Sequence, residues 1–201
     1  MHSGFRHYLH MTTSLMGTDR VSGEFNVPRT MTPDELGDTL ARLVWENFTD
    51  FIAEGEAEVS LEELGVPTEE GVPVAHAAEE ALIFLMWAHT RGTQLAFMGR
   101  SPDTLLKEGL DAMHRAVFED MAEHGTPQAQ LPLFEQRVGA RYAEYHQASA
   151  VSDHRLGEAV CRHICEDEEP HEALGRAVTV RAVAVANPLK DFLEEVDLID
   201  A

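Results

Sequence analysis

Four side chains between residues 154 and 165 have the types and the spacing of a metal site. His154, Glu158, Cys161 and Cys165 follow one another at intervals of four, three and four residues. On an α-helix this spacing places all four on one face. Imidazole, carboxylate and thiolate groups are the usual protein ligands of zinc. The stripe therefore predicts a candidate metal site, to which His171 could contribute from beyond Pro170.

Packing is the competing interpretation of the same stripe. The segment also carries apolar residues at helical spacing, and a free cysteine beside such a face commonly acts as a small apolar side chain.

Cys161 and Cys165 are four residues apart, which on a helix separates their Cβ atoms by about 5–6 Å. A disulfide requires about 3.8 Å. Both thiols are therefore predicted to be free, as is typical of a reducing cytoplasm.

Other motifs that could carry chemistry are weak in this sequence. Helical di-iron sites use Glu-x-x-His motifs, and the one literal match, Glu168 to His171, contains Pro170, which spoils the shared helical face. We find no argument for a Ser-His-Asp set, a glycine-rich phosphate loop or a Cys-x-x-Cys redox motif. No catalytic residue is predicted, any cofactor is unknown, and whether the chain is an enzyme stays open.

An acidic pair at the start of an apolar run is a second polar feature. Glu79 and Glu80 precede residues 81–88, which read ALIFLMWA. A carboxylate that points into packed surface requires an arginine, a hydrogen-bond donor or a cation. The alternative is that both acids lie just outside the core and face water. The arginines that could pair with them are Arg91, Arg137 and Arg141.

The apolar run also indicates how the fold is organised. A helix that is apolar on every side must be buried on every side, so residues from about 73 to 98 are predicted to form a central helix that buries Trp87. We therefore expect an all-α protein, a compact bundle of six or seven helices around this helix. No segment alternates with period two, so no strands are expected. The other predicted helices are 32–55, 102–124, 131–149, 153–166, 171–186 and, after an interruption at Pro188, 189–199.

The first thirty residues differ from the rest of the chain. They are low in acid, lack helical periodicity and hold three of the eleven histidines, His2, His7 and His10. Residues 1–30 are predicted to be an N-terminal arm, extended or flexible, and an arm that packs on another helix or another subunit is the alternative. Residues 31–201 are predicted to form a single all-helical domain. No secretory signal is recognised, and no apolar run approaches the ~20 residues of a membrane span.

Charge restricts the class of partner. The chain has 36 acidic residues, 15 Lys and Arg, and a formal net charge of −21. Nucleic-acid backbones are bound by clustered basic residues, so direct nucleic-acid binding is not expected. A basic protein partner or a cation fits the field of an acidic chain better. Solubility alone is the simpler interpretation of the same charge.

These observations favour a non-enzymatic, cytoplasmic helical interaction protein of unknown specific role. Surplus amphipathic segments at both ends favour self-association, and we expect a homodimer or another homo-oligomer. The alternative is a helical bundle, with or without enzymatic activity, that binds a metal or a small ligand through His, Cys and Glu side chains. A further alternative is an acidic decoy that occupies a basic nucleic-acid-binding protein.

Overall fold

The computed structural model describes residues 30–54, 60–167 and 171–200, in which the chain forms six helices and two pairs of very short strands. The predicted arm therefore lies outside the described residues, except for Thr30. The helices are α2 (Pro33–Glu54), α3 (Ala75–Phe97), α4 (Asp103–Glu123), α5 (Leu131–Val151), α6 (Asp153–Cys165) and α7 (Glu172–Glu194). The strands are β1 (Thr30–Met31), β2 (Thr68–Glu69), β3 (Val72–Pro73) and β4 (Asp197–Leu198). The expected all-α class is confirmed.

Helix α3 is the centre of the bundle, as its apolar sequence predicts. It contacts each of the other five described helices, and its middle is buried on all sides. Trp87 is 3% exposed and meets the ring of Tyr145, from α5, edge to face. The predicted burial of Trp87 is confirmed.

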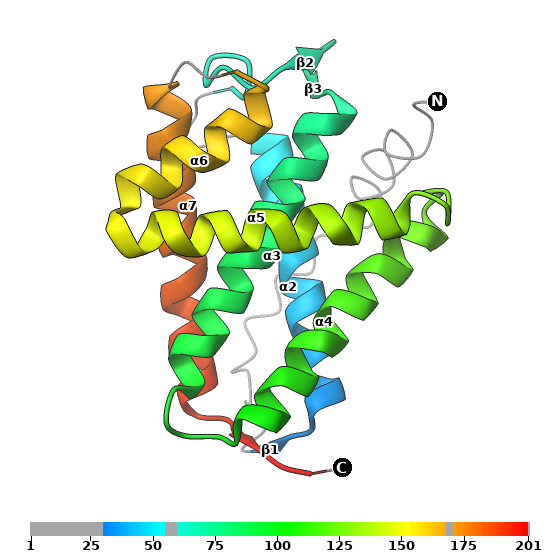
Figure 1. Cartoon of the computed structure of the whole chain (residues 1–201), viewed down its shortest axis with the longest axis vertical. Helices are drawn as coiled ribbons and strands as arrows, with labels where there is room; N and C mark the ends of the chain where they lie inside the picture. Colours follow the sequence, from blue (N-terminus) through cyan, green and yellow to red (C-terminus); the bar gives the residue numbers. More distant parts are fainter. Residues whose placement is uncertain (1–29, 55–59, 168–170, 201) are drawn as a thin grey trace, which may run out of the picture.

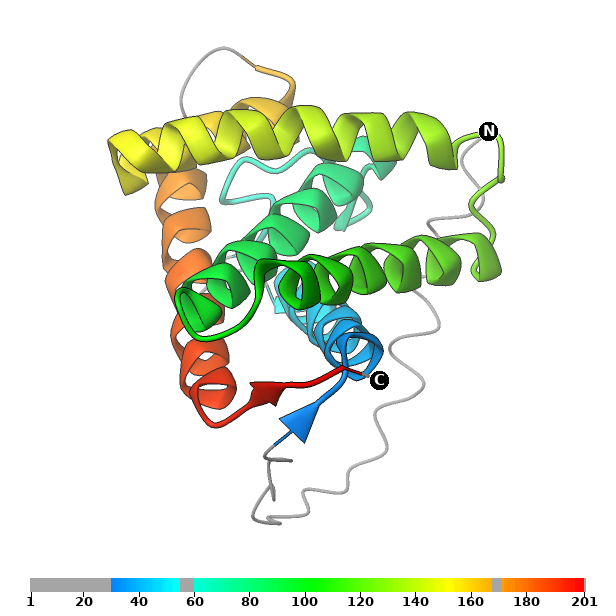
Figure 2. The same cartoon turned by 60° about the horizontal axis from the view of Figure 1, so that its bottom comes forward.

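The other helices cover α3 from different directions (Figures 1 and 2). Helices α2 and α4 pack closely on each other, and α7 packs on both α3 and α6. Helix α5 crosses the front of the bundle in Figure 1, and α6 follows it toward α7. Helices α4 and α5 follow each other in sequence, yet they diverge from the loop that joins them (Figure 1).

Side chains at several helix starts explain where the helices begin. Thr32 and Glu35 form a reciprocal capping box on α2, with the backbone N–H of Thr32 donating to the Glu35 carboxylate at 2.8 Å. The Ser152 hydroxyl accepts a hydrogen bond from the Arg155 N–H at the start of α6. Helix α4 begins differently, because its N-cap is Pro102 and no side chain caps it.

The predicted interruption at Pro188 is wrong, because α7 continues through this residue to Glu194. A proline removes one helical hydrogen bond, to the carbonyl four residues before it. That carbonyl belongs to Ala184, and both residues are exposed, so water can satisfy the carbonyl. The buried side chains of Leu189 and Leu193 hold the last turns of α7 against the bundle.

Short strands join the two ends of the described chain, contrary to the expectation of none. Strand β1 pairs in parallel with β4, and the Ile199 N–H donates to the Met31 carbonyl at 3.0 Å. Strands β2 and β3 form a separate antiparallel pair. The segment 189–199 is therefore docked, with Val196 fully buried, but it is not a separate helix.

Arg100 connects the C-terminal end of α3 to that of α7. One guanidinium nitrogen donates to the carbonyls of Ala96 and Leu193. The other donates to the carbonyls of Glu194 and Val196, at 2.8 and 3.1 Å. Unpaired carbonyls at a helix end need such donors.

Among the described helices, none combines the length and the apolar character that crossing a membrane requires.

Candidate functional site

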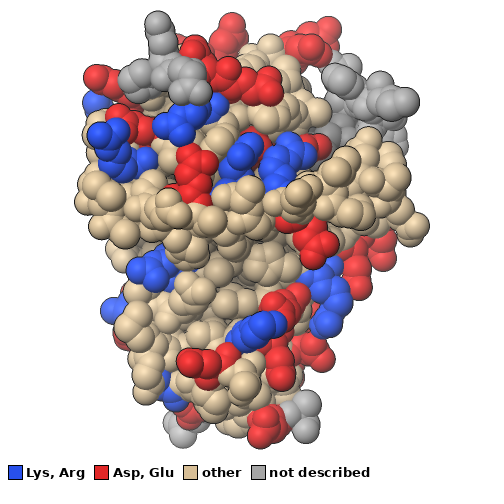
Figure 3. All heavy atoms as spheres, viewed as in Figure 1, with Lys and Arg blue, Asp and Glu red and all other residues tan. Residues whose placement is uncertain are grey.

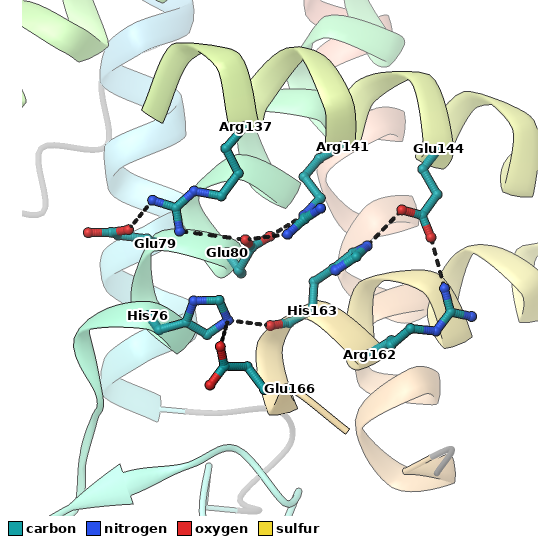
Figure 4. Close-up of polar contacts among 9 residues, drawn as sticks. All are labelled: His76, Glu79, Glu80, Arg137, Arg141, Glu144, Arg162, His163 and Glu166. Atoms are coloured by element: carbon teal, nitrogen blue, oxygen red, sulfur yellow. Dashed lines mark hydrogen bonds and ion pairs between the residues drawn. The ribbon is translucent and has the colours of Figure 1, made fainter. Parts of the chain in front are cut away.

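Helix α5 is attached to α3 by two acid–arginine pairs (Figure 4). Glu80 is fully buried, and Arg141 donates two hydrogen bonds to its carboxylate at 2.9 and 3.0 Å. Arg137 pairs with Glu79 and lies 3.7 Å from Glu80. Paired charges of this kind specify geometry. The interpretation in which both acids face water is thus wrong for Glu80, and an arginine partner is present.

A second group of polar contacts attaches α6 to α5 and α3. Glu144 accepts hydrogen bonds from His163 at 2.7 Å and from Arg162 at 2.9 Å. The His76 imidazole donates to the His163 carbonyl at 2.7 Å and lies 3.7 Å from the Glu166 carboxylate (Figure 4). Each of these groups already has a protein partner, so the network fixes how the helices cross and offers no spare group for chemistry.

A hydroxyl–imidazole chain links α3, α4 and α5. The His114 Nδ1–H donates to the Leu110 carbonyl at 2.7 Å, so Nε2 is free to accept from the Tyr142 hydroxyl at 2.9 Å. The Thr90 hydroxyl lies 3.3 Å from the same Tyr142 oxygen. Burial lowers the pKa of His114 and raises the pKa of Tyr142 well above its ordinary value. At neutral pH the chain is uncharged, and its hydrogen bonds are internal.

A groove of about 730 Å³ separates α4 from α5. The residues on each side recur at helical intervals over about three turns, so the groove is lined by one face of α4 and by one face of the first turns of α5. From α4 it is lined by Asp111, His114, Arg115, Phe118, Glu119 and Ala122. From α5 and the residues just before it, the lining is Gln128, Leu131, Glu135, Val138, Gly139 and Tyr142.

The groove has an apolar floor and two acids on its walls that have no ion-pair partner among the described residues. The rings of Phe118 and Tyr142 and the side chain of Val138 form much of the floor. The exposed acids are Glu119, from α4, and Glu135, from α5. Figure 3 shows the surface hollowed below α5, with an uncharged floor and charged side chains beside it.

The predicted metal ligands lie in a different groove, between α6 and α7. This groove has a volume of about 460 Å³ and is lined by His154, Glu158 and Cys161, together with His171 at the start of α7. Cys165 does not line it, because its thiol donates to the Gly65 carbonyl at 3.3 Å. The structure thus brings three of the four predicted ligands to one groove and directs the fourth elsewhere.

The state of these side chains does not favour metal binding. Burial raises the pKa of Cys161 to about 12 and that of Cys165 to about 11, which makes the thiolate form that binds a metal more costly to reach. Glu158 already accepts a hydrogen bond from Arg155 at 2.8 Å. Within the described ranges, no three His, Cys, Asp or Glu side chains are grouped so that they could hold a metal ion. Both cysteines are free, as predicted.

Sequence reasoning missed the α4–α5 groove. Tyr142 and His114, which the structure places in its lining, were not among the predicted site residues. The structure shows that Gly139, between Val138 and Tyr142, is exposed, which the sequence does not reveal. A Cβ built on Gly139 would meet nothing within 4 Å.

Comparison with known proteins finds no match to a protein family, to a curated protein or to a solved structure.

Proposed function

We propose that this protein is a non-enzymatic, cytoplasmic interaction protein that receives a helix of its partner in the α4–α5 groove. The observation that carries the proposal is the pair of facing helical stripes, Asp111 to Ala122 and Gln128 to Tyr142, which leave an apolar floor open between them. An amphipathic helix recognises such a groove with apolar residues at i, i+3, i+4 and i+7. Three turns correspond to a contact about 16 Å long.

The walls of the groove are held in place before any partner binds. Helix α4 is packed along α2, while the Glu80–Arg141 pair fixes α5 to α3 and the Glu144–His163 contact fixes it to α6. A preformed groove loses little conformational entropy on binding, which favours affinity. The polar networks of the molecule thus support a binding role by shaping the groove.

The alternatives have less support. A small-ligand site needs polar groups that converge on the ligand. The Thr90–Tyr142–His114 chain, however, is satisfied internally. The acids Glu119 and Glu135 are exposed on opposite walls.

A metal site in the α6–α7 groove lacks Cys165, whose thiol is directed to the Gly65 carbonyl, and burial raises the pKa of the remaining thiol, Cys161. An acidic decoy imitates phosphates and has no use for an apolar floor.

Filling the groove tests the proposal. Gly139→Phe places a ring in the groove at a position with free space, and Ala140→Phe adds the same ring to an exposed position of α5 outside the lining. The wild type and both variants serve as bait in a lysate. A protein retained by the wild type is identified by mass spectrometry and purified, and its Kd for all three baits is measured by calorimetry.

We expect Gly139→Phe to weaken binding at least tenfold and Ala140→Phe to leave it within twofold. Equal affinity of all three baits would place the interaction elsewhere and reject the groove. Self-association is measured with the same proteins by light scattering over a range of concentrations. A dimer that only Gly139→Phe dissociates would make a second copy the occupant.

A further inference from the structure

We infer that the partner helix of the α4–α5 groove carries basic residues on both flanks of its apolar stripe. The inference rests on the proposed function and names the chemistry of its partner. It comes from the charged residues on the two walls, of which some form ion pairs within the chain and others do not.

Two of the four charges that line the groove are neutralised within the chain. Asp111 pairs with Lys107 along α4, and Arg115 pairs with Asp34 of α2 at 2.9 Å. Both pairs are exposed and draw these side chains toward neighbours beside the groove. They leave little charge for a partner to recognise.

The other two charges are acids on opposite walls. Glu119 is exposed on α4 and Glu135 is exposed on α5, and neither has an ion-pair partner in the part of the chain that the structure describes. The apolar floor lies between them. A helix bound on that floor therefore presents one flank to each carboxylate. A Lys or Arg on each flank would form an ion pair with the carboxylate that it faces.

The rest of the molecule favours the same partner. A net charge of −21 attracts a basic helix over long range and repels a second acidic copy. Lysine is present only as Lys107 and Lys190, and in the described residues both pair with acids on their own helices. Charge complementarity thus favours a different, basic protein as the partner over a second copy of this chain.

Designed peptides test the inference with the full chain. The probe has about 18 residues, five turns, with a Leu stripe flanked on both sides by Lys, and a matched peptide has Glu in place of each Lys. Their Kd values are measured by fluorescence anisotropy. The proteins are the wild type, Glu119→Gln/Glu135→Gln and, as a control with the same change in net charge, Glu108→Gln/Glu123→Gln. Glu108 and Glu123 are exposed on α4 and do not line the groove.

We expect the Lys-flanked peptide to bind the wild type and the Glu-flanked peptide to bind at least tenfold more weakly. Glu119→Gln/Glu135→Gln is expected to weaken binding of the Lys-flanked peptide about five- to tenfold, from roughly half a kcal/mol or more per exposed pair. The control is expected to change it less than twofold. Added salt should reduce the difference between the two double variants.

Equal weakening by both double variants would overturn the inference, since only the general field of an acidic chain would then attract the peptide. Equal affinity for the two peptides would overturn it as well. The Gly139→Phe variant separates these failures from failure of the proposed function. If the two peptides bind the wild type with equal affinity and Gly139→Phe abolishes both interactions, the groove function stands and the charge inference is wrong. If Gly139→Phe changes neither interaction, the groove itself is rejected.

Discussion

Glu80 and Arg141 show what one buried contact contributes to this molecule. The carboxylate is fully buried and the guanidinium side chain is 21% exposed. Removing both charges from water costs free energy that their attraction repays only with good geometry, and the two parallel hydrogen bonds provide it. The pair therefore fixes the position of α5 on α3 more than it adds to stability.

Breaking the Glu80–Arg141 pair on one side should be costly. Arg141→Met leaves a buried carboxylate without its main partner, and we expect the free energy of unfolding to fall by about 3 kcal/mol. Glu80→Met/Arg141→Met should recover much of that loss. Arg42→Met removes an exposed pair with Glu46 and should cost less than about 1 kcal/mol. Urea unfolding compares the variants, and a single variant no worse than the double would contradict this account.

His89 should make the protein less stable in acid. Burial lowers its pKa to about 4, whereas the unfolded chain binds the proton near pH 6.5. The stabilisation is therefore complete above pH 6.5 and is lost as the pH falls toward 4. The shift corresponds to about 3 kcal/mol. Unfolding free energies at pH 7 and about pH 4.5 should differ less in His89→Leu than in the wild type, and an unchanged difference would exclude His89 as the cause.

At the residue scale, the sequence predicted the burial of single apolar residues better than it predicted the burial and the contacts of charged ones. Burial of Trp87 followed from its apolar neighbours, whereas burial of Glu80 did not follow from the sequence, which left open that Glu79 and Glu80 both face water. Which arginine would pair with Glu80 could not be predicted, because Arg91 and Arg141 are carried by different helices. That choice depends on how α5 crosses α3.

Among the elements, α6 and α7 approach so closely that their backbones meet. A Cβ on Gly157 would lie 2.6 Å from the carbonyl oxygen of Gly175, closer than real contacts allow. The close approach brings Cys161 of α6 against the start of α7, where its thiol lies 3.9 Å from the His171 carbonyl. Small residues here set the distance between the two helices.

Two alanine substitutions should therefore have opposite effects. Gly157→Ala must push α7 away and should lower the free energy of unfolding by about 2 kcal/mol or more. Gly139→Ala adds a methyl group with nothing within 4 Å and should raise it by up to about 1 kcal/mol, since alanine is the better helix former. Thermal unfolding of both variants checks the signs. Stabilisation by Gly157→Ala would mean that the helices are farther apart than described.

Helix existence was predictable, and helix ends and angles were less so. Thr32 and Ser152 cap their helices, and such caps are accessible to sequence analysis because capping is a local interaction. Pro188 was misread because its tolerance depends on which face of α7 meets water. The α4–α5 groove could not be predicted, since the divergence of two helices is set by contacts with α2, α3 and α6 that are distant in sequence.

For the whole molecule, Arg100 and the β1–β4 pair close the bundle at one end. Neither feature has a periodic signal, since β1 and β4 contain two residues each and Arg100 lies in the turn after α3. The four carbonyls that Arg100 binds come from α3 and from the end of α7 and its extension.

Replacing Arg100 should loosen this end of the molecule. Arg100→Met is expected to lower the free energy of unfolding by about 2–3 kcal/mol, because several charge-assisted hydrogen bonds are lost together. Arg100→Lys should recover little, since an ammonium lacks the planar fork. Hydrogen exchange should accelerate at residues 193–199. Lys190→Met, which removes an exposed pair with Glu194, is the control, and equal exchange in the two variants would rule out the role assigned to Arg100.

The parallel direction of β1 and β4 has a mechanical consequence. The chain enters β1 at one end of the pair and leaves β4 at the opposite end (Figure 2). Tension applied across Thr30 and Leu198 therefore acts along the strands, in shear, and loads the inter-strand hydrogen bonds together instead of opening them one by one. A molecular machine that pulls on either end must first overcome this contact before any helix is extracted.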